Sequence, residues 1–520
     1  MSVSSATATL ERPQVRESDE GASSQARLAA AARYGWLALA LALGALCRFW
    51  HLTAPSLFID EGFTFHISSY DPKSLLHAVA YTDFHPPLFY LATHYLMGWL
   101  HWQPWDYRYS TAACGLVTIA ATWGIARMLF GTTAAAIAAL FVALEPNLIV
   151  WDRLYRMYAI LVALTTLSWW LLLKAEASEL RRRWFFWAAY WLCAVLLPYV
   201  QYLGAVAVLS QSLYALAHRR RCWPALIGGV AALAALVPWF WAIRVQYPHG
   251  GLVLPLTSPR FSWPVLVRAI ITSGIPAAWV LSAHFDQIFC AIVLAIAAAG
   301  VYLGRKTALA FWLLPVLIQL VVTITTGKDI VIPRHLYAYL PAFAVCLALV
   351  CVRLFATKWR VAGAALALSF FAMSAVSIPN NLFVQYYQFP DWYAINTLLL
   401  ARAHKTDLII LDQGAEYWVV HDFSGFRGHQ IDAPGIPSDI PPDVRWLEGY
   451  PKRRVWYIEN QPFFTDAGRH IQADLERTRP RVGAWIQPRI FDEDVVRVVL
   501  YGPRFGARGL TKSVVKTTSP

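Results

Sequence analysis

Two apolar stretches decide the fold: residues 34–49 read YGWLALALALGALCRF, and residues 223–241 read WPALIGGVAALAALVPWFW. Each is close to the ~20 residues that an α-helix needs to cross the hydrocarbon core of a bilayer. Similar runs recur before residue 380, with charged residues between them. One such run could be a buried core helix, but a series of them indicates a polytopic membrane bundle.

The composition supports a membrane protein and argues against a nucleic-acid-binding one. The 520 residues are 58% hydrophobic and 14% charged, whereas soluble proteins are about 25% charged. The net charge is +13, but the Lys and Arg residues stand in short clusters between the apolar runs, as in cytoplasmic loops. No basic strip alternates with stacking aromatics, so no nucleic-acid partner is predicted.

The apolar runs predict about eleven crossings of the bilayer. Their approximate bounds are 34–52, 108–127, 131–150, 156–174, 184–200, 203–217, 223–244, 285–303, 307–326, 335–355 and 360–378. A further apolar segment, 86–102, would reverse the side of every later loop if it crossed, and the Lys/Arg clusters would then violate the positive-inside rule. We therefore predict that it forms a juxtamembrane or re-entrant helix.

This count places the N-terminus in the cytoplasm and the C-terminus outside a cell (inner) membrane. Residues 1–33 are expected to be a disordered cytoplasmic tail, and residues 34–380 a transmembrane module with outer loops at 53–107 and 247–284. In residues 381–520 charged residues and Pro return. Strands are predicted there at 407–412 and 454–458, a helix at 467–478, and a terminal hairpin from 482–486 and 495–501. The prediction is a helical bundle with a small extracytoplasmic α/β domain.

The seven Cys residues predict neither disulfides nor a zinc site. They are Cys47, Cys114, Cys193, Cys222, Cys290, Cys346 and Cys351, and no two of them have metal-ligand spacing. No acidic cluster is present beyond Asp60 and Glu61, so we expect no cofactor and no metal requirement, with a divalent metal left open.

The adjacent carboxylates Asp60 and Glu61 follow the first apolar run. They are the best candidates for a catalytic base, because transfer of a group to a hydroxyl needs a carboxylate that accepts the proton of the attacking hydroxyl. The alternative is structural: Asp60 could cap a short helix that begins at Glu61.

A second motif in the same loop is Asp83-Phe84-His85-Pro86-Pro87. The Pro pair fixes the backbone direction and lets a helix start at the membrane surface. His85 could then donate to a phosphate oxygen and Asp83 could line a substrate pocket. The alternative is that His85 is only an interfacial residue.

Cations stand at the predicted outer ends of helices. Arg108, Arg156, Arg334 and His335 are candidate phosphate ligands, because Arg matches phosphate geometry and a departing phosphate needs its charge stabilised. Any one Arg could instead extend its head group to the interface, so the prediction depends on several converging. Glu145, an acid within an apolar run, and Tyr158 are assigned to the substrate pocket.

In these motifs the chain resembles the GT-C glycosyltransferases of the dolichyl-phosphate-mannose protein mannosyltransferase type, and more closely their bacterial relatives of glycosyltransferase family thirty-nine and the lipopolysaccharide-core sugar transferases. The matching pieces, in order, are Asp60-Glu61, His85-Pro86-Pro87-Leu88, Arg108 with Ser110, Leu129-Phe130-Gly131, Arg156-Met157-Tyr158-Ala159 and Arg334 to Pro341. The chain departs where Arg153-Leu154-Tyr155 replaces a Gln-Glu-Ala common in relatives.

The resemblance implies a polyprenyl-phosphate-linked sugar donor, direct transfer with inversion, and Asp60 at the position of the family's catalytic carboxylate. We therefore predict a membrane glycosyltransferase that moves a hexosyl or pentosyl group to an extracytoplasmic lipid, polysaccharide or protein. Two alternatives remain: a lipid or sugar transporter (flippase) without chemistry, whose polar residues would gather near the midplane, and a catalytically inactive envelope assembly protein.

Overall fold

The computed structural model describes residues 34–217, 222–249, most of 298–383 with positions 292 and 295–296, and then 391–411, 430–432, 445–460, 469–487 and 496–505. The predicted tail 1–33, nearly all of the predicted loop 247–284 and most of the predicted span 285–303 lie outside the described residues.

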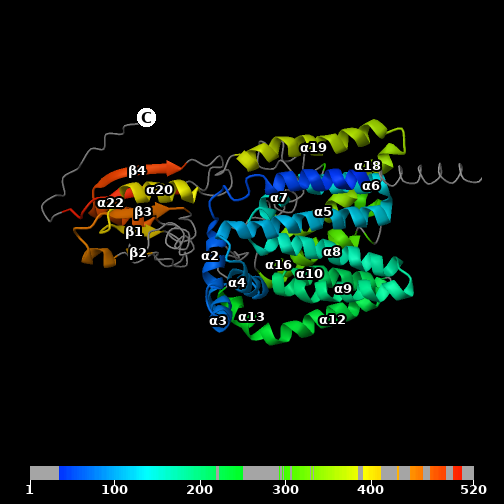
Figure 1. Ribbon diagram of the computed structural model, residues 1–520, viewed down its shortest axis with the longest axis horizontal. Coiled ribbons are helices and arrows are strands. Elements are labelled where there is room, and N and C mark those ends of the chain that lie inside the picture. Colours follow the sequence, from blue (N-terminus) through cyan, green and yellow to red (C-terminus); the bar gives the residue numbers. More distant parts are fainter. Residues whose placement is uncertain are drawn as a thin grey trace, which may run out of the picture.

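The described helices form an elongated bundle (Figure 1). It begins with the apolar helix Tyr34–Phe49. The following members are α5 (Arg108–Phe130), α6 (Thr132–Leu144), α7 (Pro146–Asp152), α8 (Met157–Ala177), α9 (Leu180–Val200), α10 (Gly204–Ala217), α12 (Pro224–Leu236), α13 (Phe240–His249), α16 (Leu314–Thr326), α17 (Pro333–Leu336), α18 (Leu340–Phe355) and α19 (Arg360–Phe383). Gly131, with φ 89°, separates α5 from α6, a conformation that suits a residue without Cβ.

Within the described residues, six helices are long and apolar enough to cross a membrane, or seven if the bent pair α6 and α7 counts as one span. Three shorter apolar helices, Tyr34–Phe49, Gly204–Ala217 and Ala310–Thr326, coincide with further predicted spans. The prediction of a polytopic helical bundle is confirmed. The span predicted at 131–150 is not straight: it breaks by 56° between Leu144 and Pro146.

The first loop contains three short helices that lie across one end of the bundle (Figure 1). They are α2 (Ile59–Ser68), α3 (Pro72–Thr82) and α4 (Leu88–Leu100). Asp71 caps α3 by accepting from the backbone of Lys73 and Ser74, and Pro87 precedes α4 where its fixed φ favours a helix start. The segment predicted as a juxtamembrane or re-entrant helix, 86–102, is thus α4.

The chain after residue 390 adds α20 (Trp392–Arg402), α22 (His470–Thr478) and a five-stranded sheet in the order β2-β1-β3-β5-β4. The strands are β1 (Leu408–Leu411), β2 (Gln430–Asp432), β3 (Val455–Glu459), β4 (Arg481–Gln487) and β5 (Val496–Tyr501). β1 pairs in parallel with β2 and β3, and β5 pairs antiparallel with β3 and β4. The predicted α/β character is confirmed, whereas the sequence prediction missed α20 and β2.

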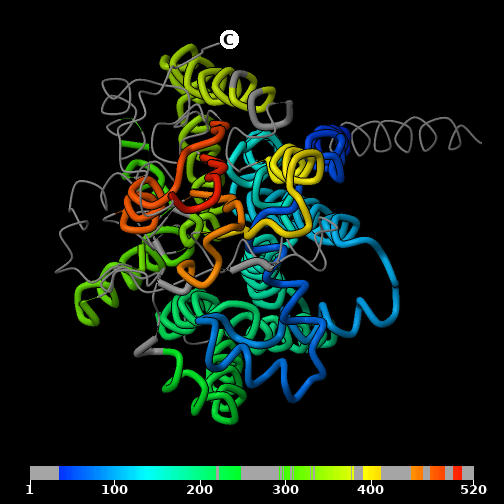
Figure 2. Tube along the Cα trace, turned by 90° about the vertical axis from the view of Figure 1, so that its left-hand side faces the viewer, coloured from blue at the N-terminus to red at the C-terminus, as the bar shows by residue number. Residues whose placement is uncertain are grey.

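Each face of this sheet has its own apolar core, because side chains alternate along a strand. Leu475 of α22 packs on one face, with Leu408, Val455 and Tyr457. Trp392 of α20 packs on the other, with Ile409 and Trp456. The sheet lies beyond the end of the bundle that carries α2 to α4, and Figure 2 looks onto that end.

Candidate active site at the first-loop end of the bundle

Adjacent residues on a helix point about 100° apart, so α2 directs Asp60 and Glu61 to different surroundings. The Glu61 side chain is fully buried, whereas that of Asp60 is 33% exposed. The two carboxylates predicted as one catalytic pair therefore have separate environments.

Glu61 and Arg108, here called the framework pair, form a two-pronged buried ion pair. Arg108 Nε donates to Glu61 Oε1 (2.8 Å) and Arg108 Nη2 donates to Oε2 (2.6 Å). Glu61 also accepts from the backbone N–H groups of Phe58 (2.8 Å) and Tyr155 (2.7 Å). These four bonds occupy both carboxylate oxygens, as a buried charge requires.

Arg108 completes its own set of partners on the backbone of the first loop. It donates to the carbonyls of Leu52 (3.3 Å), Pro55 (2.9 Å) and Ser56 (2.8 Å). The geometry thus favours a structural role for Glu61, which was predicted as a candidate catalytic base, and for Arg108, which was predicted as a phosphate ligand.

Asp60 faces Arg156, which stands at the N-terminus of α8. The Asp60 Oδ2 to Arg156 Nε distance is 3.8 Å, an ion pair that is too long for a hydrogen bond. Arg156 Nη1 donates to Asp60 O (3.1 Å) and to Thr64 Oγ1 (2.6 Å). Arg156 is buried, but its Nε has no hydrogen-bond partner among the described residues.

Asp83 and His85 form a second acid–base pair beside Arg156. His85 Nδ1 lies 2.9 Å from Asp83 Oδ1, and both side chains are 4% exposed. Burial raises the pKa of the Asp83 carboxyl, but His85, Tyr90 and Arg156 outweigh it and bring that pKa to about 2. His85 Nε2 is buried without a partner in the described part of the chain.

Arg334 and His335 belong to α17, and they lie beside Tyr158 of α8. Tyr158 lies in electrostatic range of Arg334, Arg156, Asp60 and Asp83, and its ring centroid is 6.3 Å from that of His335. His335 Nδ1 lies 2.8 Å from the Ile330 carbonyl. Arg334 Nε is buried with no partner among the described residues.

We call Asp60, Asp83, His85, Arg156 and Arg334 the open cluster. Buried polar groups in folded proteins are nearly all hydrogen-bonded. Within the described residues, unpaired buried nitrogens occur on three cluster members: His85, Arg156 and Arg334. Of the predicted site residues, the structure brings the open cluster together with Tyr158 and His335.

Glu145, predicted to line the substrate pocket, instead caps α7. Its carboxylate is fully buried and accepts from Leu148 N (2.8 Å) and Asn147 Nδ2 (2.9 Å). This capping explains the break in the predicted span: the carboxylate satisfies the start of a new helix inside an apolar run.

Some polar residues of this end were not predicted from the sequence. Arg48 Nε donates to Asp152 Oδ2 (2.7 Å) in a pair that is almost fully buried. Arg153, the cation next to the departure from the family pattern, donates to carbonyls at the end of the first helix, including that of Trp50 (2.6 Å). Gln246 of α13 donates to His85 O (3.0 Å) and thereby fixes the backbone of the loop before α4. The intramembrane setting of Arg48 and Asp152 was the available signal.

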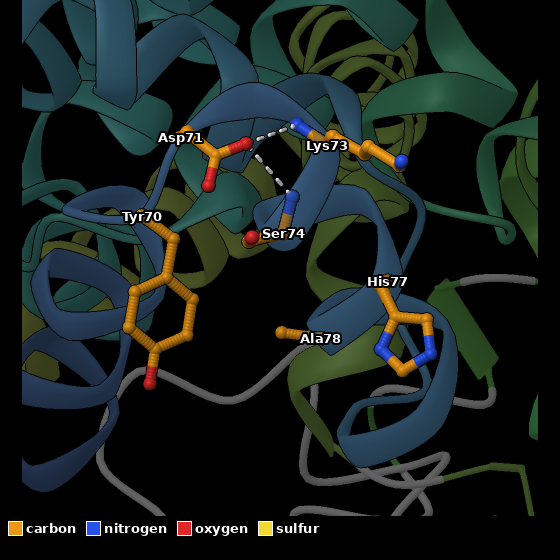
Figure 3. A pocket seen from close by; sticks show the side chains of 6 residues that line it. All are labelled: Tyr70, Asp71, Lys73, Ser74, His77 and Ala78. Carbon is orange, nitrogen blue, oxygen red and sulfur yellow. Dashed lines mark hydrogen bonds between the residues drawn. The ribbon is translucent and has the colours of Figure 1, made fainter.

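An open groove of about 750 Å³ lies beside the turn from α2 to α3 (Figure 3). It is lined by Tyr70, Asp71, Lys73, Ser74, His77 and Ala78. Asp71 is engaged there as the helix cap (Figure 3). We do not include this groove in the candidate site. In the part of the chain that the structure describes, no three His, Cys, Asp or Glu side chains group closely enough to hold a metal ion.

Comparison with solved structures defines the class of fold. ArnT from Cupriavidus metallidurans bound to undecaprenyl phosphate is similar at a TM-score of 0.53 and 15% identity, over 90% of this chain and 98% of that one. Its apo form gives 0.54 at 14% identity over the same shares. The Archaeoglobus fulgidus oligosaccharyltransferase in complex with Zn and sulfate gives 0.51 at 12% identity, over 90% of this chain and 73% of that one. The chain therefore shares the fold of these proteins, which is the GT-C type of helical membrane bundle predicted from the sequence.

The sequence match is narrower. Residues 84–241 match the family model described as dolichyl-phosphate-mannose-protein mannosyltransferase. This range contains His85, Arg108, Arg156 and Tyr158, and it confirms the resemblance drawn from the motifs. No curated protein sequence matches the chain.

Proposed function

We propose that this protein is a membrane glycosyltransferase that moves a hexosyl or pentosyl group from a polyprenyl-phosphate-linked donor to an extracytoplasmic acceptor. The observation that carries the proposal is the open cluster, in which a carboxylate that is one-third exposed faces Arg156, and in which Arg156, Arg334 and His85 have buried ring or guanidinium nitrogens without a partner among the described residues. The nitrogens of such a site could bind the phosphate of the donor, and the carboxylate could act next to the sugar carbon that is attacked. The solved ArnT structure bound to undecaprenyl phosphate supports a lipid phosphate as ligand.

In the proposed reaction Asp60 is the base. It accepts the proton of the acceptor hydroxyl while that oxygen forms a bond to the anomeric carbon. The bond from the anomeric carbon to the phosphate oxygen breaks on the opposite side, which inverts the configuration. The electron pair of that bond stays on the lipid phosphate.

The cations of the open cluster would stabilise this leaving phosphate. Arg156 and Arg334 have unpaired buried Nε–H groups, and fixed donors aimed at developing charge are an effective form of catalysis. Asp83 holds His85 by its Nδ1 and leaves Nε2 for the phosphate. Asp83 is thereby a positioning residue for His85 in this proposal. Glu61 is a positioning residue for Arg156, because it accepts from the backbone N–H of the preceding residue, Tyr155.

The open cluster favours a transferase over a transporter, since its residues lie on α2, in the loop before α4 and at the starts of α8 and α17 rather than at a break within a span. A catalytically inactive assembly protein would have no use for a partly exposed carboxylate beside cations that keep nitrogens without a partner among the described residues. We predict no metal requirement, and the sugar and the acceptor are to be read from the product.

The test is deletion of the gene in its host, followed by restoration with either wild type or Asp60→Asn. Mass spectrometry of envelope lipids, glycans and glycoproteins should show a sugar-sized loss on deletion that returns with wild type alone. The mass difference identifies sugar and acceptor together. If deletion changes no glycan, the transporter and the inactive assembly protein replace the transferase as the favoured functions. If Asp60→Asn restores the sugar, Asp60 is not the base.

A further inference from the structure

One apolar core of the C-terminal sheet is completed by a residue of the membrane module. Ile59, the first residue of α2, is 6% exposed and belongs to the same buried cluster as Trp392, Ile409 and Trp456. Phe58 packs against this cluster. The residue next to Ile59 along the chain is Asp60.

A hydrogen bond reinforces this contact. The backbone N–H of Trp392, at the start of α20, donates to Ser56 Oγ at 3.1 Å. The Trp392 side chain is fully buried. Asp391 caps α20 by accepting from Ala394 N (3.2 Å), which fixes the helix start at this point.

The same short segment is held from the bundle side by Arg108, which binds the carbonyls of Pro55 and Ser56. Residues 55–59 therefore lie between α5 and α20, with Asp60 directly after them. The position of Asp60 depends on both contacts, since α2 begins where this segment ends.

We propose that Trp392 is a positioning residue for Asp60, and that the C-terminal α/β region is thereby part of the catalytic framework. The inference rests on the proposed function. His85 comes from the loop before α4 and Arg334 from α17, so these two phosphate ligands do not depend on this contact, whereas Arg156 of α8 donates to Asp60 O and to Thr64 of α2. Loss of Trp392 should therefore displace the base and leave most of the donor binding intact.

The test uses the full-length protein in liposomes and compares Trp392→Ala with Leu475→Ala. Both side chains are fully buried, but Leu475 packs on the opposite face of the sheet, away from Ile59. A displacement of about 1 Å at a reacting group costs roughly 100-fold in rate. We expect kcat to fall roughly 10- to 100-fold in Trp392→Ala with KM for the donor nearly unchanged, and Trp392→Phe to restore most of it.

Hydrogen exchange gives a readout without turnover. Peptides that cover residues 56–66 should exchange faster in Trp392→Ala than in Leu475→Ala. Ile59→Ala, which removes the side chain that shares a buried cluster with Trp392, should lower kcat to a similar extent as Trp392→Ala. Equal kcat and equal exchange in the Trp392 and Leu475 variants would overturn the inference. An inactive wild type would instead overturn the proposed function, while the exchange comparison would still decide whether Trp392 fixes α2.

Discussion

The framework pair and the open cluster lie on either side of one short helix, and they treat charge in opposite ways. Glu61 and Arg108 have a partner for every oxygen and each guanidinium nitrogen. Arg156, at the start of α8, has an Nε without a hydrogen-bond partner among the described residues, and this Nε lies 3.8 Å from the Asp60 carboxylate. A buried charge with all partners present holds a fold together, whereas one with a partner missing is prepared for a ligand.

The largest expected effect is that of an Asp60 substitution, which should lower the rate of transfer and leave the stability of the fold unchanged. Asp60→Asn should lower transfer about 10²- to 10⁴-fold, because an amide cannot accept the acceptor proton. Its unfolding temperature should stay near that of wild type, since the side chain is one-third exposed. Turnover and thermal unfolding in detergent measure the two. Asp71→Asn, in the same loop, is the control and should keep its turnover. A stable, fully active Asp60→Asn would contradict the assignment.

Glu61→Gln should do the reverse and destabilise the protein by roughly 3–5 kcal/mol, because Arg108 loses its charge partner in a buried setting. Denaturant unfolding and the yield of folded protein report this. The double variant Glu61→Met with Arg108→Met should recover part of the loss, since replacing both charges removes the unpaired one. A Glu61→Gln protein as stable as wild type but inactive would move Glu61 into the chemistry.

Arg334→Gln should lower transfer roughly 10²-fold, with little change in unfolding temperature, because a donor to the leaving phosphate is lost. Arg353→Gln, near the other end of the same helical segment and exposed, is the matched control and should be neutral. Steady-state kinetics with a synthetic lipid-phosphate sugar measures both. Equal effects of the two substitutions would remove Arg334 from the phosphate site.

The smallest effect concerns pH. The pKa of Asp83 is about 2 in the folded protein and about 3.9 in an unfolded chain, so its ionised form stabilises the fold by roughly 2–3 kcal/mol. Because the folded pKa is the lower one, this stabilisation is complete above about pH 4 and is lost as the pH falls toward 2. The stability gap between wild type and Asp83→Asn should therefore shrink over that range. A gap that stays constant from pH 5 to pH 2 would argue against the shifted pKa.

The fold was predictable from the sequence because hydrophobic runs and Lys/Arg placement follow from the bilayer itself. Ten of the eleven predicted spans coincide with described helices, and the exclusion of 86–102 agrees with α4. The residues of the open cluster were also predicted, because Asp60, Asp83 and His85 lie in the first loop and Arg156 and Arg334 lie at the starts of predicted spans.

The roles of these residues were less predictable, since partners came from distant parts of the chain. Nothing local separates Asp60 from Glu61; the difference comes from Arg108 and the Tyr155 backbone, 47 and 94 residues away. Glu145 looked like a pocket acid because its neighbours are apolar, and only the start of α7 gives it a structural role.

The contact between Ser56 and Trp392 has a consequence for biosynthesis, since it joins positions 336 residues apart. At about 5–20 residues per second, a ribosome needs roughly 17 to 67 seconds to pass from one to the other. During that time the segment before α2 is bound by Arg108 but not yet by Trp392. The nascent chain would then be inserted in the membrane well before it is competent for transfer, so the lipid donor would be used only by a finished polypeptide.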